Sequence, residues 1–150
     1  MLIQTKHFGE IDFDESKIVT MEKGIFGFEG NQRWAILYDN SDKQNIICWL
    51  QSIEDAGLCL PLIKPDVFFY DYNPDVPDEV LTGLGILRED GYDLYNVVVI
   101  PEDLTKMTVN LKAPIIIHLD TKKGIQVVLD SDKYPIRYSL YDLLTEKEGE

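Results

Sequence analysis

Gly24-Ile25-Phe26-Gly27-Phe28-Glu29-Gly30 is a stretch in which three glycines recur at every third position between apolar residues. Glycine adopts positive φ at little cost, so this stretch can turn tightly where other residues would be strained. It lacks the Lys-Ser/Thr pair and the strand-to-helix context of a phosphate-binding loop. We therefore expect a connection that folds closely over a β-sheet. Its two phenylalanines either fill the core or form an exposed apolar loop, and we expect Phe26 or Phe28 to cap the core.

The composition is that of an ordinary globular protein of one domain. The chain has 150 residues, of which 45% are hydrophobic and 27% are charged, close to the usual balance. No run approaches the ~20 apolar residues that a membrane-spanning helix needs. Residues 1–6 lack the long apolar region of a signal peptide, so we expect a cytoplasmic protein.

The charge balance favours a protein partner over a nucleic acid. The chain has 14 basic and 27 acidic residues, which gives a net charge of −13. A protein with this charge repels the phosphate backbone of nucleic acids. It would attract a basic protein and speed their encounter. A role of the acidic residues in solubility alone explains the net charge equally well. A monomer is the default expectation.

Short β-prone runs separated by turn residues follow one another along most of the chain. They lie at residues 2–6, 9–13, 17–21, 34–38, 46–52, 58–63, 67–72, 94–100, 104–111, 113–119 and 125–129. One short helix is expected at residues 77–84, where proline and acidic residues begin an apolar pattern. Pro61 places its strand at an edge or a bulge. The pattern predicts one mostly β domain over residues 1–144, a small antiparallel β-barrel-like or sandwich fold, with a disordered polar tail at 145–150.

The residues that usually carry catalysis are scarce. Cys48 and Cys59 lie in apolar runs without metal-ligand spacing, which predicts buried free thiols. His118 lies in an apolar strand, where a hydrogen-bonded core histidine is the commoner role. The run from Asp39 resembles a calcium loop, but Gln44 stands where that loop needs glycine. We therefore expect no enzyme, no cofactor and no metal site, and a binding module is the default.

One aromatic and acidic span has the composition of an interface hot spot. It supplies the partner-binding candidates Asp66, Phe69, Tyr70, Asp71, Tyr72 and Asp75. Alternate aromatic residues of this span could instead point into the core. A second possibility is a small β-barrel enzyme or ligand carrier, in which a metal or small molecule is held by Asp66, Asp71, Asp75 and His118.

Three motifs appear in the order and spacing of the flagellar assembly factor FliW family. They are Gly24-Ile25-Phe26-Gly27-Phe28, Trp49-Leu50-Gln51-Ser52 and Asn110-Leu111-Lys112-Ala113-Pro114-Ile115. Gln126-Val127-Val128 in the following strand also fits. The chain resembles this family from about residue 2 to residue 144. The motifs are weak one by one, and their order within an acidic chain of this length makes the resemblance specific.

The resemblance implies a non-enzymatic bacterial cytoplasmic protein with a β-barrel-like fold. Proteins of this family bind newly made flagellin and also bind CsrA, an RNA-binding translational repressor. Binding of CsrA relieves repression of flagellin mRNA, and flagellin competes for the family member. In the glycine-rich stretch, Phe26, Phe28 and Glu29 are further contact candidates, ranked behind the aromatic and acidic span. CsrA must carry positive charge to hold RNA, so an acidic partner should find it quickly.

Overall fold

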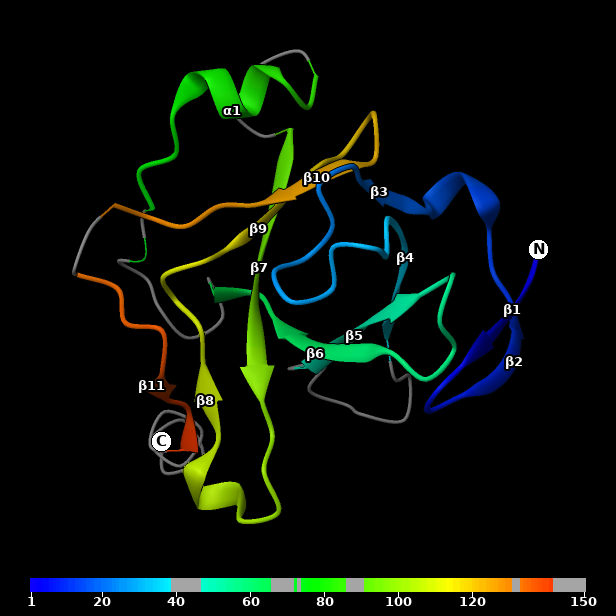
Figure 1. The fold of residues 1–150 in the computed structure, drawn as a ribbon, viewed down its shortest axis with the longest axis horizontal. Helices are drawn as coiled ribbons and strands as arrows, with labels where there is room; N and C mark the ends of the chain where they lie inside the picture. The colour runs from blue at the N-terminus through cyan, green and yellow to red at the C-terminus, as the bar shows by residue number, and fades with distance from the viewer. Residues whose placement is uncertain (39–46, 66–71, 73, 86–90, 131–132, 142–150) are drawn as a thin grey trace.

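Seven strands form a closed β-barrel in the computed structural model, which describes residues 1–38, 47–65, 72, 74–85, 91–130 and 133–141 (Figure 1). Around the barrel they are β7 (Tyr92–Val99), β6 (Cys59–Ile63), β5 (Ile47–Ser52), β4 (Arg33–Tyr38), β3 (Val19–Met21), β10 (Lys123–Gln126) and β9 (Ile115–His118). A pairing of β9 with β7 closes the ring. Neighbouring strands are antiparallel except β10 and β3, which run parallel. The expectation of a small, mostly β domain is confirmed, and the barrel is the correct alternative.

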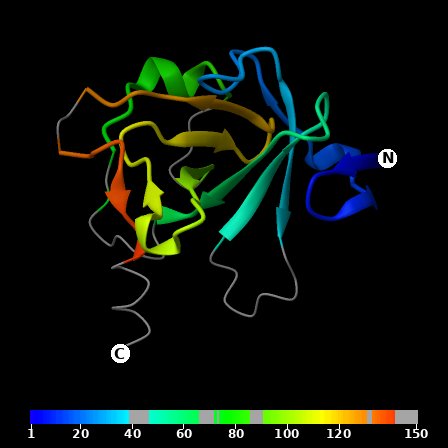
Figure 2. The ribbon, with the colours of Figure 1, turned by 60° about the horizontal axis from the view of Figure 1, so that its bottom comes forward.

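Smaller elements surround the barrel (Figures 1 and 2). At one end β1 (Leu2–Thr5) and β2 (Gly9–Asp12) form an antiparallel hairpin. Far from it, β8 (Thr108–Val109) and β11 (Tyr138–Ser139) extend the sheet beyond β7. Single 3-10 turns, η1 (Glu15–Lys17) and η3 (Leu104–Lys106), precede β3 and β8. No helix among the described residues is long and apolar enough to cross a membrane.

The expected helix is present but short. α1 (Asp78–Thr82) has five residues and lies beside β10 and β9 in Figure 1. Pro77 occupies the N-cap position without a side-chain hydrogen bond to the helix, and Gly83 follows its last residue. A helix this short needs support from the rest of the fold, because isolated helices need about 12–15 residues to persist in water. Just after the helix, the hydroxyl of Thr121 donates to the carbonyl of Leu84 at 2.8 Å.

Three apolar clusters hold these elements together. The largest fills the barrel around Trp34, Leu50 and Ile115, none of which has exposed surface. The second lies where β8 and β11 meet β7, and the third lies between the β1–β2 hairpin and β4. Burying a large apolar side chain contributes roughly 1.5–3 kcal/mol, so the barrel cluster is the main source of stability.

Two details of the strands differ from expectation. β6, which contains Pro61, is not an edge strand, because β5 and β7 flank it on both sides. Its pairing with β7 involves only Leu62 and Ile63, so Pro61 lies before that ladder begins and interrupts no bond there. The strand expected at 104–111 is reduced to β8, since a 3-10 turn occupies residues 104–106.

The two cysteines are free and buried, as expected. They do not face each other, because Cys48 pairs with Leu62 and Cys59 pairs with Gln51 across β5 and β6. Expectations for residues 39–46, 67–71 and 145–150 lie outside the described part of the chain.

Candidate functional site

The glycine-rich stretch forms a tight turn, named here the Phe turn (residues 25–28). The backbone N–H of Phe28 donates to the carbonyl of Ile25 at 2.7 Å, and Gly27 has a φ of 90°, which is typical of the third position of a type II turn. Phe26 is 53% exposed and Phe28 38% exposed, whereas Ile25 is only 2% exposed. The expectation that a phenylalanine caps the core is therefore wrong. Ile25 fills that position because the turn directs both rings outward.

Gly24 explains why the chain can return so closely on itself. Its φ is 68°, and a Cβ at this position would lie 2.5 Å from the Cα of Glu29. Any other residue would clash with that backbone and would adopt a disfavoured conformation. Ile25 packs in the barrel cluster directly after this glycine. The expected close fold of the connection over the sheet is confirmed.

A buried glutamine holds the Phe turn to the barrel. The backbone N–H of Phe26 donates to Oε1 of Gln126 at 2.9 Å. The Nε2 of Gln126 donates to the carbonyl of Ala113 at 3.2 Å. On the other side of the turn, the N–H of Gly27 donates to Oε1 of Glu29 at 3.2 Å. Both amide groups at the tip of the turn are thus bonded to side chains, which restrains the backbone that carries the two rings.

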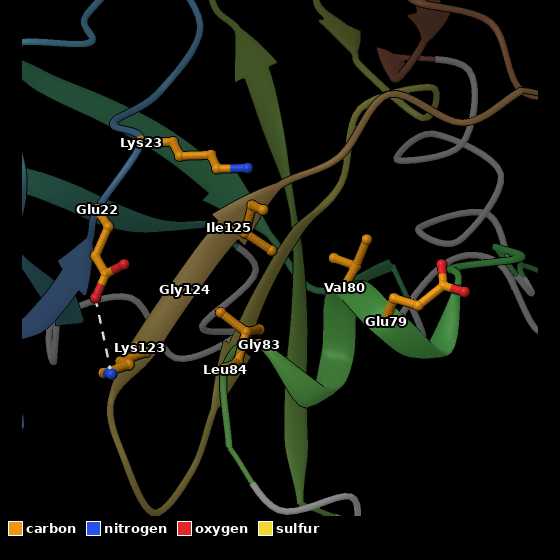
Figure 3. A pocket seen from close by; sticks show the side chains of 9 residues that line it. All are labelled: Glu22, Lys23, Glu79, Val80, Gly83, Leu84, Lys123, Gly124 and Ile125. Atoms are coloured by element: carbon orange, nitrogen blue, oxygen red, sulfur yellow. Dashed lines mark ion pairs between the residues drawn. The ribbon is translucent and has the colours of Figure 1, made fainter.

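A pocket of about 360 Å³ adjoins the segments that carry the Phe turn and its tether (Figure 3). Its apolar lining comes from Val80 and Leu84 near α1 and from Ile125 of β10. Its charged lining consists of Glu22, Lys23, Glu79 and Lys123. Glu22 and Lys123 form an ion pair at 3.7 Å. Glu22 and Lys23 directly precede Gly24, and Ile125 directly precedes Gln126, so the pocket and the turn belong to one region.

The aromatic and acidic span is described only in part. Asp66, Phe69, Tyr70 and Asp71 lie outside the described residues, and Asp75 is exposed. Tyr72 is half-buried and packs edge-on against Tyr134. Its hydroxyl donates to the carbonyl of Leu111 at 2.6 Å and accepts from Nδ2 of Asn96 at 3.2 Å. Burial raises the pKa of Tyr72 to about 12. Its hydroxyl therefore bonds to groups of this chain, and its ring packs on Tyr134.

His118 is a core residue, as expected. It is buried, and its Nδ1 accepts from the backbone N–H groups of Asp120 and Thr121 at 3.2 and 3.1 Å. Gly85 packs so closely that a Cβ there would lie 2.7 Å from Nε2. An imidazole bonded and enclosed in this way is not open to a metal or substrate from solvent. The described residues contain no group of three or more potential metal ligands.

The thiols are likewise unsuited to nucleophilic chemistry. Burial raises the pKa of Cys48 to about 12 and that of Cys59 to about 11. The reactive species is the thiolate, so both groups are protonated and inert near neutral pH.

Sequence reasoning missed the role of the polar motif residues, which tether loops to the barrel. Gln51 has no exposed surface; its Oε1 accepts from the N–H of Lys6 at 2.9 Å, and its Nε2 donates to the carbonyls of Ala56 and Leu58 at 3.1 and 3.2 Å. The Oδ1 of Asn110 accepts hydrogen bonds from the backbone N–H groups of Lys112 and Ala113. A polar residue inside an apolar run was the available signal, because buried polar groups need hydrogen-bond partners.

Together these features define a small barrel domain that presents a tethered apolar turn beside a pocket. The family model described as FliW protein matches residues 2–140. The chain therefore belongs to the FliW family.

Full-length relatives support this assignment. The protein of Lachnospira eligens named flagellar assembly factor FliW is 47% identical over 151 residues, which cover 99% of this chain and 100% of that protein. The protein of the same name from Lachnoclostridium phytofermentans is 46% identical over 95% of this chain and 92% of its own length. A crystal structure of the flagellar assembly factor FliW superposes with a TM-score of 0.84 at 31% identity, over 94% of this chain and 97% of the other.

Proposed function

We propose that this protein is a non-enzymatic, cytoplasmic flagellar assembly factor that binds flagellin and the translational repressor CsrA. By binding CsrA it relieves repression of flagellin mRNA translation, and flagellin competes with CsrA for it. The observation that carries the proposal is similarity along the whole chain to relatives named as flagellar assembly factors, at up to 47% identity.

The charge of the chain supports a basic partner. A net charge of −13 attracts a positively charged protein and repels the RNA that such a protein holds. Long-range attraction of this kind raises the rate of encounter more than the final affinity. The protein therefore acts on CsrA directly and has no need to touch the mRNA.

The Phe turn is the best-supported contact surface. Phe26 and Phe28 are exposed on a turn whose backbone is hydrogen-bonded to side chains, one of which is the carboxylate of Glu29. Exposed aromatic residues beside charge have the composition of binding hot spots. The span with Asp66, Phe69, Tyr70, Asp71, Tyr72 and Asp75 is the second proposed contact surface.

Titration calorimetry of the purified full chain with purified CsrA, and separately with purified flagellin, tests this function. Saturable binding of each protein with Kd in the micromolar range or below, about −8 kcal/mol, is the expected result. The absence of binding to both proteins would contradict the proposal. A metal analysis of the same preparation serves as the control for the alternative, because stoichiometric bound metal would favour a metal-dependent enzyme or carrier.

A further inference from the structure

The Phe turn and Gln126, the residue that tethers it, lie far apart in the sequence. Gln126 follows Phe26 by 100 positions, and its side chain is the hydrogen-bond partner that the structure gives to the Phe26 N–H. Gln126 itself is 9% exposed and is bonded on its other side to Ala113. The amide of Gln126 thus joins the tip of an exposed turn to the backbone of the barrel wall.

A turn fixed in this way differs from an ordinary surface loop. Its rings stand outward although apolar rings in a free loop would fold back onto nearby apolar surface. Apart from its two chain neighbours, no atom lies within 4 Å of the Cβ position of Gly27, so the turn has open space on that side. The bonds from Gln126 and Glu29 add to the hydrogen bond between Phe28 and Ile25 within the turn in holding its shape.

We infer that Gln126 is a positioning residue for partner binding: it holds the Phe turn in the conformation that presents Phe26 and Phe28 to a protein partner. This inference rests on the proposed function. A contact that is already ordered before binding loses less conformational entropy when the complex forms. The matching partner surface is an apolar recess bordered by basic groups, because Glu29 brings a carboxylate beside the rings.

A merely structural glutamine would behave differently, and Gln51 provides the comparison. Gln51 is also a buried glutamine whose amide tethers a loop, but its partners are Lys6 and the residues after β5. Methionine has a similar volume and cannot form these bonds, so Gln126→Met and Gln51→Met each remove one buried tether with little change in packing.

The two variants are compared in full-length protein by urea unfolding, by hydrogen exchange of the Phe26 amide and by titration with CsrA and with flagellin. Both should lose stability. Only Gln126→Met should expose the Phe26 amide to rapid exchange, and only it should weaken binding, by roughly tenfold for at least one partner. Equal loss of affinity in both variants, or none in Gln126→Met, would overturn the inference.

Phe26→Ala separates failure of this inference from failure of the contact surface. If the exposed ring makes the contact, Phe26→Ala weakens binding, and adding Gln126→Met causes little further loss because both changes act through the same ring. Unchanged affinity in Phe26→Ala would show that the Phe26 ring does not contact the partner, and the inference about Gln126 would be rejected as well. If Phe26→Ala weakens binding but Gln126→Met binds with wild-type affinity, the Phe turn remains the contact surface. Only the positioning role of Gln126 is then rejected.

Discussion

The backbone N–H of Phe26 and the side chain of Gln126 form a 2.9 Å hydrogen bond across 100 positions of sequence. This bond joins the first quarter of the chain to the last strand of the barrel. Lys123 and Gly124 of that strand pair in parallel with Thr20 and Met21, just before the Phe turn. The conformation of the turn therefore depends on closure of the barrel, and the family motifs act together as parts of one tertiary arrangement.

Alanine substitutions in the glycine-rich stretch should have graded effects on stability. Gly24→Ala should lower the free energy of unfolding by more than about 2 kcal/mol, because positive φ and a backbone clash act together. Gly27→Ala should cost about 1 kcal/mol, since its φ is positive but the space is open. Gly30→Ala, with neither feature, should change stability by less than about 0.5 kcal/mol. Urea unfolding measures all three, and equal effects at residues 24 and 30 would contradict the close return of the chain.

Removing the exposed rings should weaken binding without unfolding the protein. The double variant Phe26→Ser/Phe28→Ser should lose at least tenfold in affinity for CsrA or flagellin, about 1.4 kcal/mol. The matched control is Val99→Ser/Leu104→Ser, which changes two apolar residues that are 59% and 54% exposed elsewhere on the surface. Equal affinities for the two double variants would exclude the Phe turn as the contact surface.

Stability should fall at alkaline pH. Burial raises the pKa of Cys48 from 9.0 to about 12 and that of Tyr72 from 10.0 to about 12, and it raises the pKa of Tyr95 as well. These groups stay protonated in the folded state while the unfolded chain loses their protons. Their contribution is therefore complete below about pH 9 and is lost as the pH rises toward about 12.

Urea unfolding at pH 7.5, 9 and 10.5 measures this loss, with Cys48→Ala as the comparison. The variant should show a shallower decline with pH because one of the shifted groups is gone. A free energy of unfolding that is the same at all three pH values would contradict the burial of these groups.

Association with CsrA should be sensitive to salt. The acidic chain steers a basic partner over distances that salt screens, so the association rate should fall as ionic strength rises from about 0.05 to 0.5 M. The dissociation rate should change far less, because salt does not screen an apolar contact such as the one proposed for the Phe turn. Stopped-flow mixing of the two proteins measures both rates. An association rate independent of salt would reject electrostatic steering.

Much of the fold could be predicted because alternating and apolar runs mark strands locally. The runs that became β4, β5, β7 and β9 were recognisable from β-branched and aromatic residues alone. Closure of the barrel was not predictable, because it depends on the pairing of β9 with β7 and the parallel pairing of β10 with β3. Such long-range contacts leave no periodic signal in either strand.

The candidate site was predictable in outline only. The glycines of the stretch predict a turn. Ile25 and the two phenylalanines are all apolar, so the sequence does not say which of them faces inward. The positive φ values of Gly24 and Gly27 decide that question. Gln51 and Gln126 stand out as polar residues within β-runs, but that pattern alone does not say that they are buried. Their bonding partners lie on other segments, so the tethers become visible only in three dimensions.

Competition between the two partners tests the central claim most directly. Fluorescently labelled CsrA is bound to the full-length protein, and unlabelled flagellin is titrated while fluorescence anisotropy reports bound CsrA. The proposed function predicts that flagellin releases CsrA, and that the flagellin concentration needed for half-release rises with the concentration of CsrA. Anisotropy that remains at the bound value under saturating flagellin, with flagellin binding the same complex, would contradict it.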